Sequence, residues 1–443
     1  MEALALAAGI IAKVEEAGVV GAGGAGFPTH HKLNTKVDTI IVNGAECEPL
    51  LYVDQELMAT KAQVLVATLE QLLTATGASE GFIALKGKYQ RALKALQAAI
   101  RGTKIKIYQL PNYYPIGDEH VLTYEVTKRI IPPGGIPPRV GVLVLNVETV
   151  VNIAGALDGK PVVEKYVTIN GNVDTPGTYV VPVGTPIREL LAIAGQKGND
   201  NLVLVGGPMM GKIVSETDVV TKTTKGIIVL PVRHPLSRKK VTETTSRFQR
   251  LLNGCCQCRQ CTDFCPRYLL GHNLEPHRSM RCLALKVMQI DWLEVARLCS
   301  ECGLCDLFVC PSGLSPRTVH KAIKVHLAAA GYRSQFQDME PQPRATRAWR
   351  QIPTDRLIAR LNLAEYNRPL PFYKEKMQPS KVILPLKQNA GVASIPVVAV
   401  GEEVEYGQLV ARVPEGQLGA NLHASIKGRI TNTSEAIVIE SSS

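Results

Sequence analysis

Eight cysteines form two short runs, and this spacing is the strongest chemical signal of the chain. The first run is Cys255-x2-Cys258-x2-Cys261-x3-Cys265, followed by Pro266, and the second is Cys299-x2-Cys302-x2-Cys305-x4-Cys310, followed by Pro311. Three thiolates spaced by two residues can wrap one face of an iron–sulfur cubane, while a fourth comes from a proline-terminated turn. The pattern therefore predicts two [4Fe–4S] clusters.

In ferredoxins with two clusters, the last cysteine of each run ligates the cluster of the other run. The predicted ligands are Cys255, Cys258, Cys261 and Cys310 for one cluster, and Cys299, Cys302, Cys305 and Cys265 for the other.

Several features of these runs leave alternatives open. A pair of zinc sites is the main one, although zinc sites usually present separated cysteine pairs without the third, equally spaced thiol. The x4 spacing before Cys310 requires a bulge of one residue. Cys256 competes with Cys255 as a ligand, but the regular step favours Cys255. Cys47 and Cys282 are predicted to be ordinary buried thiols.

A glycine-rich loop near the N-terminus is the second chemical signal. Residues Gly21 to Gly26 satisfy G-x-G-x-x-G, but a dinucleotide fingerprint requires a strand before it and a helix opening within it. Residues 4–16 look helical instead, and Phe-Pro-Thr follows the loop. The loop can still bring backbone N–H groups against a phosphate, and a merely flexible loop is the alternative.

Composition restricts the class of protein. The 443 residues, 45% hydrophobic and 20% charged, predict several packed domains and exclude global disorder. The net charge of +11 is spread along the chain and aromatic residues make up only 5%, so nucleic-acid binding is kept only as a second-class alternative. No apolar run has spanning length, and residues 1–16 resemble an amphipathic helix rather than a signal peptide. Cysteines in such runs favour a reducing compartment.

Alternating strand-like and helix-like stretches precede the cysteines. Strands are expected at 38–42, 82–85, 104–110 and 141–145, and helices at 55–74, 89–100, 119–127 and 148–157. This alternation predicts an α/β domain with a largely parallel sheet. A hairpin at 166–182 and a short helix at 185–195 follow. A proline-punctuated linker with one helix near 355–361 then leads to a Val- and Gly-rich tail that is expected to be all-β.

Two strings near the N-terminus carry a family resemblance. GVVGAGGAGFPTHHKL and VNGAECEP closely resemble the flavin-binding segment shared by the 51-kDa subunit of respiratory complex I and the RnfC proteins. YPIGDE, LNVETVVNIA, GGPMMG and the two cysteine runs extend the resemblance over essentially the whole chain. The sequence is thereby identified as a member of the RnfC/PduS family.

This resemblance implies an α/β flavin domain followed by a β-grasp module, an α-helical dicluster ferredoxin domain and a C-terminal all-β barrel-sandwich hybrid. The expected boundaries are 1–160 for FMN and NADH binding, 161–225 for the β-grasp (SLBB-like) module, 238–330 for the dicluster domain, 331–379 for a linker and 380–443 for the barrel-sandwich hybrid. The last of these is expected to be a docking domain.

The resemblance also implies a set of cofactor-binding residues. Gly21, Gly23 and Gly24 would wrap the FMN phosphate with Lys32 nearby; Asn43, Glu46 and Glu48 would line the isoalloxazine and nicotinamide region; Gly117, Asp118 and Glu119 would lie over the flavin and the NADH ribose; and Asn146 and Thr149 would lie on the phosphate side.

Two departures from the complex I subunit affect this set. Ala22 stands where that subunit has Arg, so phosphate neutralisation would depend on Lys32. Leu50-Leu51 replaces a Gly-Thr turn near the expected NADH position. Acidic residues near a flavin favour NADH, because they bind ribose hydroxyls and reject a 2′-phosphate.

The implied activity is oxidation of NADH, with electrons passing through FMN and two [4Fe–4S] clusters to a partner acceptor. A flavin is needed because NADH donates two electrons at once whereas a cluster accepts one. No general-base triad is required. Alternatives are a corrinoid reductase of a diol-utilisation microcompartment, the NADH-input subunit of a methylenetetrahydrofolate reductase complex, and an iron–sulfur scaffold without turnover. The expected setting is the cytoplasm or the interior of a microcompartment, within a hetero-oligomer.

Overall fold

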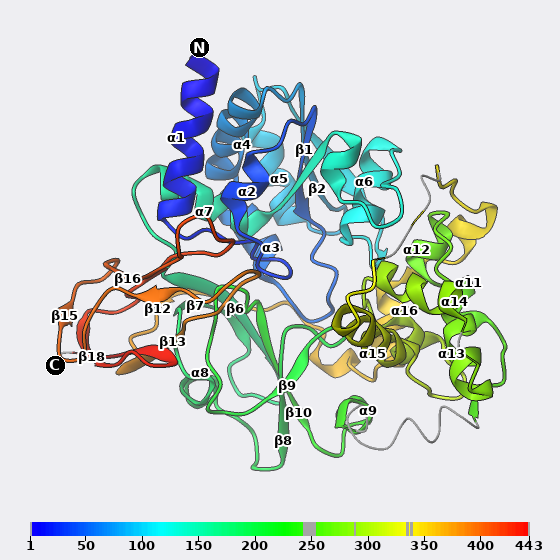
Figure 1. Ribbon diagram of the computed structural model, residues 1–443. Coiled ribbons are helices and arrows are strands. Elements are labelled where there is room, and N and C mark those ends of the chain that lie inside the picture. The colour runs from blue at the N-terminus through cyan, green and yellow to red at the C-terminus, as the bar shows by residue number, and fades with distance from the viewer. Residues whose placement is uncertain (1, 242–253, 288, 334–335, 337–339, 442–443) are drawn as a thin grey trace.

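The computed structural model describes residues 2–241, 254–287, 289–333, 336 and 340–441. Parts of the predicted dicluster domain (242–253) and of the predicted linker (334–335 and 337–339) lie outside the described residues. In Figure 1 the N-terminal domain lies at the top, the cysteine-bearing helices lie at the right and the C-terminal strands lie at the lower left.

The N-terminal domain is built on a four-stranded parallel sheet, as the alternating pattern predicted. Its strand order is β3-β2-β1-β5, formed by β1 (Thr39–Gly44), β2 (Glu80–Lys86), β3 (Ile105–Leu110) and β5 (Val142–Asn146). Side chains alternate between two cores, since Ile40 and Val42 face one side of the sheet and Ile41 faces the other.

Helices cover both faces of this sheet. The face of Ile40 and Val42 packs against α1 (Glu2–Glu16), α3 (Val53–Thr60), α4 (Ala62–Thr76), α5 (Gln90–Ala99) and α7 (Val147–Leu157), whereas the opposite face packs against α6 (Glu119–Thr127). The short elements of this domain are α2 (Thr29–Leu33), β4 (Tyr113–Tyr114) and η1 (Pro137–Val140). The predicted helix at 55–74 is two helices that meet at Lys61; α3 packs chiefly on α5 and also on α7, whereas α4 packs chiefly on α7 and α1 and also on α5.

The strand order creates a crevice at one edge of the sheet. From β1 the chain proceeds to β2 and β3 on one side, and then returns to place β5 on the other side of β1. The crossovers therefore diverge at the carboxyl ends of β1 and β5, which is the place where open α/β sheets bind ligands.

The β-grasp module is a six-stranded sheet in the order β12-β7-β6-β10-β8-β9. The predicted hairpin is β6 (Glu164–Gly171) and β7 (Gly177–Pro182), and the predicted helix is α8 (Ile187–Ala194). The sheet continues through β8 (Asn201–Val205), β9 (Lys212–Val214) and β10 (Gly226–Pro231). β10 lies beyond the expected end at residue 225 because its apolar run fills the centre of the sheet, and β12 (Phe372–Lys376) joins the edge from the predicted linker.

The cysteine-bearing domain is helical, as expected. The chain reaches it through α9 (Pro235–Val241). Its elements are α11 (Gln260–Asp263), α12 (Pro266–Leu269), α13 (Pro276–Leu285), α14 (Ile290–Glu294), the 3-10 helix η2 (Val295–Leu298), the π-helical turn η3 (Cys305–Val309) and α15 (Pro316–Ala329). Proline at the first turn of α12, α13 and α15 fixes where each helix begins.

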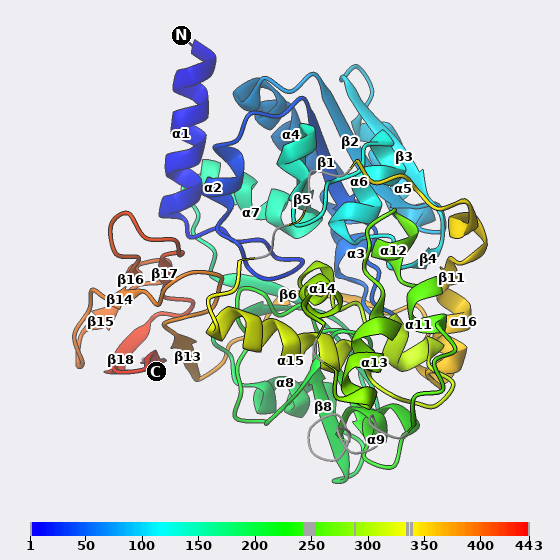
Figure 2. The ribbon, with the colours of Figure 1, turned by 45° about the vertical axis from the view of Figure 1, so that its right-hand side comes forward.

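The described part of the predicted linker packs against the N-terminal domain, the β-grasp module and the cysteine-bearing domain. It contains η4 (Ala345–Trp349), β11 (Ile352–Pro353), the predicted helix as α16 (Thr354–Arg360) and η5 (Ala364–Tyr366). β11 pairs with β4 of the N-terminal domain, and Leu357 and Ile358 are buried in the core beside the cysteine helices. Figure 2 shows α16 beside the cysteine-bearing helices.

The C-terminal domain consists of two small antiparallel sheets, so the all-β fold predicted from the Val- and Gly-rich sequence is confirmed. One contains β13 (Lys381–Pro385), β15 (Glu403–Val404), β18 (Gly428–Asn432) and β19 (Ala436–Glu440), and the other contains β14 (Ile395–Pro396), β16 (Leu409–Arg412) and β17 (Leu422–His423). Among the described residues, no helix combines the length and the apolar character that crossing a membrane would require.

Candidate functional site

The glycine loop lies at the crevice between β1 and β5. Its ends are held by a hydrogen bond from Gly21 N to Phe27 O at 2.9 Å, and its centre by one from Ala22 N to Thr149 Oγ1 at 3.0 Å. A Cβ on Gly23 would lie 3.0 Å from Asn146 Cγ, whereas a Cβ on Gly24 would meet no protein atom within 4 Å. Gly23 therefore packs tightly against Asn146, while Gly24 faces open space that can receive a ligand.

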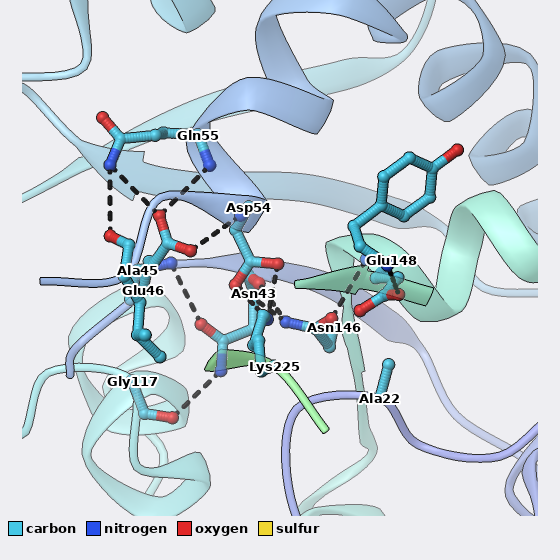
Figure 3. A network of polar contacts seen from close by, with 12 residues as sticks. Ala22, Asn43, Ala45, Glu46, Asp54, Gln55, Gly117, Asn146, Glu148 and Lys225 are labelled. Carbon is cyan, nitrogen blue, oxygen red and sulfur yellow. Dashed lines mark hydrogen bonds and ion pairs between the residues drawn. The ribbon is translucent and has the colours of Figure 1, made fainter. Parts of the chain in front are cut away.

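The carboxyl end of β1 is tied to the loop before α6. Asn43 Nδ2 donates to Gly117 O at 2.9 Å, and Asn43 Oδ1 accepts from Ala45 N at 3.2 Å. Gly117 N donates to Cys47 Sγ at 2.6 Å, so Cys47 holds this loop in place. Figure 3 shows Asn43 between Ala45 and Gly117. The structure thus brings Asn43 and Gly117 together, as the predicted site requires.

Glu46 carries a buried carboxylate at the start of α3. It accepts from Asp54 N at 2.8 Å and from Gln55 N at 3.3 Å, and its backbone has a positive φ of 38°. Burial, with a further contribution from the Asp54 carboxylate, raises the pKa of Glu46 to about 7. This carboxyl group can therefore hold or release a proton near neutral pH.

An ion pair between two domains lies beside Glu46. Lys225 Nζ, from the β-grasp module, lies 2.6 Å from both carboxylate oxygens of Asp54. Asn146 Nδ2 donates to the same carboxylate at 3.0 Å, and Asn146 Oδ1 caps α7 by accepting from Glu148 N at 3.0 Å (Figure 3). Although burial acts to lower it, the pKa of Lys225 is raised by Asp54 and Glu46.

Asp54 and Lys225 lie beside residues of the predicted site, and the sequence did not reveal them. They are 171 positions apart and belong to no shared motif. Asp54 lies 8 positions after Glu46, at the start of an ordinary amphipathic helix. Only the packing of the β-grasp module onto the sheet brings the two together.

Glu48 and Asp118 lie where the domains meet. The Glu48 carboxylate accepts from Met209 N and Met210 N, each at 2.8 Å, within the β-grasp module. Asp118 caps α6 and pairs with Arg267 of the cysteine domain at 2.9 Å. Although burial acts to raise it, the pKa of Asp118 is lowered, chiefly by the Arg267 charge. Both carboxylates are thus engaged by protein groups.

Glu119 and Lys32 form a more accessible pair. Their side chains lie 3.0 Å apart and are 42% and 27% exposed. Lys32 is the cation that the sequence placed near the phosphate, and here its charge is opposed by Glu119.

The first group of thiols surrounds one pocket. Cys255, Cys258, Cys261 and Cys310 line it together with the apolar side chains Met280 and Leu314, and Cys256 lines the same pocket. Hydrogen bonds point at these sulfurs, among them those from Leu314 N to Cys310 Sγ at 3.3 Å and from Gln257 Nε2 to Cys255 Sγ at 3.1 Å. Cys256 and Cys258 are exposed, so this pocket opens at the surface.

The second group lies deeper. Burial raises the pKa of Cys265 to about 12, and nearby Cys299 acts in the same direction. Burial, with Cys265 and Cys299 close by, likewise raises the pKa of Cys302 well above its usual range. Burial also raises the pKa of Cys305, assisted by Asp306, Cys299 and Cys302. Cys265, the last cysteine of the first run, therefore lies near Cys299 and Cys302 of the second run.

These surroundings suit iron–sulfur clusters. The thiolate is the metal-ligating form of cysteine, and buried thiols with raised pKa values become thiolates only beside a compensating cation. The predicted one-residue bulge before Cys310 is present as η3, in which Cys310 N donates to Cys305 O at 3.2 Å.

The segments that carry the second thiol group also contact the N-terminal domain. Tyr114 Oη donates to Cys302 O at 2.7 Å, and Arg267, two residues after Cys265, binds Asp118. The first group lies toward the surface, and the second lies toward the crevice of the parallel sheet.

Four sequence families match successive parts of the chain. They are the Nuo51 FMN-binding domain over residues 14–155, the SLBB domain over 166–212, the 4Fe-4S dicluster domain over 254–315 and the RnfC barrel sandwich hybrid domain over 372–443. Together with the geometry above, they define an FMN-binding iron–sulfur protein.

Characterised relatives extend over nearly the whole chain. Cobalamin reductase PduS of Salmonella typhimurium is 43% identical over 430 residues, covering 96% of this chain and 95% of the relative, and PduS of Citrobacter freundii is 42% identical over 427 residues, covering 96% and 94%. One component of the Na(+)-translocating ferredoxin:NAD(+) oxidoreductase complex of Acetobacterium woodii is 35% identical over 270 residues, covering 59% of this chain and 58% of the relative. The chain belongs to the PduS family.

Proposed function

We propose that this protein oxidises NADH and passes the electrons through FMN and two [4Fe–4S] clusters to a partner acceptor. The observation that carries the proposal is the contact between the crevice and the deeper thiol group. Through Tyr114 and Asp118, one loop of the flavin domain contacts both Cys302 and the helix that follows Cys265. Bound FMN would convert the two-electron chemistry of NADH into single-electron steps.

Residues of the crevice have distinct tasks in this proposal. Backbone N–H groups of the glycine loop beyond Ala22 receive the phosphate, because Gly21 N and Ala22 N already donate to Phe27 O and Thr149 Oγ1. Asn43 and Gly117 line the ring region, and Glu46, with a pKa of about 7, holds a proton beside it.

A corrinoid is the acceptor that the relatives favour. The cobalamin reductases align over 96% of this chain, whereas the component of the ion-translocating complex aligns over 59% of it. The exposed thiols Cys256 and Cys258 mark the side on which electrons would leave, either to a corrinoid or to a protein that carries one.

The test combines cofactor content with one glycine substitution. Anaerobically purified protein should contain one FMN and about eight iron atoms per chain, since each cluster holds four. Gly24→Val should lose FMN and NADH-driven reduction of artificial acceptors, yet retain its iron, because the added side chain meets no protein atom within 4 Å.

Gly9→Val is the matched control, since a Cβ there also meets nothing within 4 Å and the residue lies in α1, away from the crevice. This variant should keep both FMN and iron. Zinc in place of iron, or NADH oxidation at the wild-type rate by Gly24→Val, would overturn the proposal.

A further inference from the structure

The segment Thr221–Lys225 of the β-grasp module forms a preorganised turn next to the glycine loop. Thr221 N donates to Thr224 Oγ1 at 3.0 Å, and Thr224 N donates to Thr221 O at 3.1 Å. Because the turn is held by its own hydrogen bonds, it presents the side chains of Lys222, Thr223 and Lys225 to the neighbouring domain in a fixed arrangement.

Lys222 reaches the chain just before the glycine loop. Its side chain is buried, and Nζ donates to Gly18 O at 2.7 Å and to Asn421 O at 2.6 Å. Gly18 follows α1 with a positive φ of 64°. The side-chain nitrogen of Lys222 thus joins the chain just before the loop, the β-grasp module and the C-terminal domain.

Thr223 and Lys225 act on the rest of the loop. A Cβ on Gly26 would lie 2.7 Å from Thr223 Cγ2, so the methyl group of Thr223 packs directly on the end of the loop. Lys225 holds Asp54, and Asp54 accepts from Asn146, which lies beneath Gly23. One segment therefore supports the beginning, the middle and the end of the loop.

The C-terminal domain contacts both the Thr221–Lys225 turn and the glycine loop. Gln388 Oε1 accepts from Lys222 N at 3.0 Å, and Ala390 N donates to Gly26 O at 3.2 Å. Three domains consequently meet at the glycine loop.

We infer that Thr221–Lys225 is a positioning element that sets the conformation of the glycine loop and thereby its affinity for the phosphate of FMN. This inference rests on the proposed role of that loop. Glycines impose little conformation of their own, so a glycine-rich loop has a large entropy to lose when it orders around an anion. Contacts from outside the flavin domain order the loop before the ligand arrives.

The test compares FMN with riboflavin, which lacks the phosphate. Flavin-free full-length protein is titrated with each, and binding is followed by quenching of flavin fluorescence. Lys222→Met and Lys225→Met should each weaken FMN by about tenfold, a factor that corresponds to about 1.4 kcal/mol, while riboflavin affinity changes less than about twofold. Lys212→Met, at an exposed position of β9 in the same module, should change neither.

The outcomes separate this inference from the proposed function. Wild-type protein that binds FMN no better than riboflavin would overturn the role of the loop itself. A wild-type preference for FMN that persists in both variants would overturn only the positioning role. Equal weakening of both flavins would also overturn it, because the segment would then maintain the fold rather than the phosphate site.

Discussion

The buried ion pair between Glu148 and Lys165 offers a quantitative test of how the flavin domain and the β-grasp module are joined. Glu148 lies in the first turn of α7 and Lys165 in β6; their charged atoms are 2.6 Å apart and both side chains are 0% exposed. The other oxygen of Glu148 accepts from Tyr166 N at 3.3 Å. Burial lowers the pKa of Lys165, although Glu148 acts in the opposite direction.

Removing either partner alone leaves an uncompensated charge at a fully buried position. Such a change costs about 3–5 kcal/mol. Lys165→Met and Glu148→Gln should therefore each destabilise the joint by at least about 3 kcal/mol, which is more than a hundredfold in an opening equilibrium. The double variant should cost clearly less than the sum of the two, because no buried charge remains.

Amide hydrogen exchange measures this opening locally. In flavin-free protein, peptides covering residues 147–157 and 164–171 should exchange more than a hundredfold faster in each single variant. Lys106→Met is the matched control, because it removes an ion pair to Glu80 whose side chains are 59% and 43% exposed. Exposed pairs contribute about 0–1 kcal/mol, so its effect should stay below about fivefold. Additive effects of the two single changes would refute the argument.

Two further predictions concern the cysteine domain. Cys255→Ser should lower the iron content whereas Cys256→Ser should leave it at the wild-type value, and the reverse result in an iron assay would show that Cys256 is the ligand. Burial lowers the pKa of His120 to about 3 and that of His272 to about 4, and their rings lie 5.4 Å apart where the two domains meet. Because the unfolded chain takes up these protons near pH 6.5, the stability should be fully present above pH 6.5 and fall as the pH drops toward about 4. His272→Gln should make the melting temperature depend less on pH over that range. An unchanged pH profile of the melting temperature would contradict the contribution of His272.

The sequence predicted the local features of the sites because their signals are local. The spacing of the cysteines predicted a bulge before Cys310, and the π-helical turn η3 is that bulge. Glu119–Thr127 was predicted as a helix with its bounds, since Asp118 supplies a helix-capping side chain directly before it. The strand–helix alternation likewise predicted the parallel sheet.

Contacts between distant segments could not be predicted from the sequence. Lys225 pairs with Asp54 only because β10 lies beside β6, and no spacing rule connects the two residues. The break at Lys61 is marked by no glycine or proline in the sequence, and it separates two helices whose main packing partners differ. β12 looked like part of a linker because its side chains are mostly exposed, as is usual for an edge strand.

Glu48 and Asp118 show how a local motif and contacts between distant segments can involve the same residues. Motif resemblance placed both carboxylates beside the nucleotide, but their oxygens accept from Met209 and Met210 of one neighbouring domain and bind Arg267 of another. Each carboxylate lies within a few residues of Glu46 or Gly117, which are predicted to line the crevice. The loops that shape the flavin site are therefore the same loops that dock the β-grasp and cysteine domains. A displacement of either domain would therefore act on the crevice through two short segments of backbone, those that carry Glu48 and Asp118.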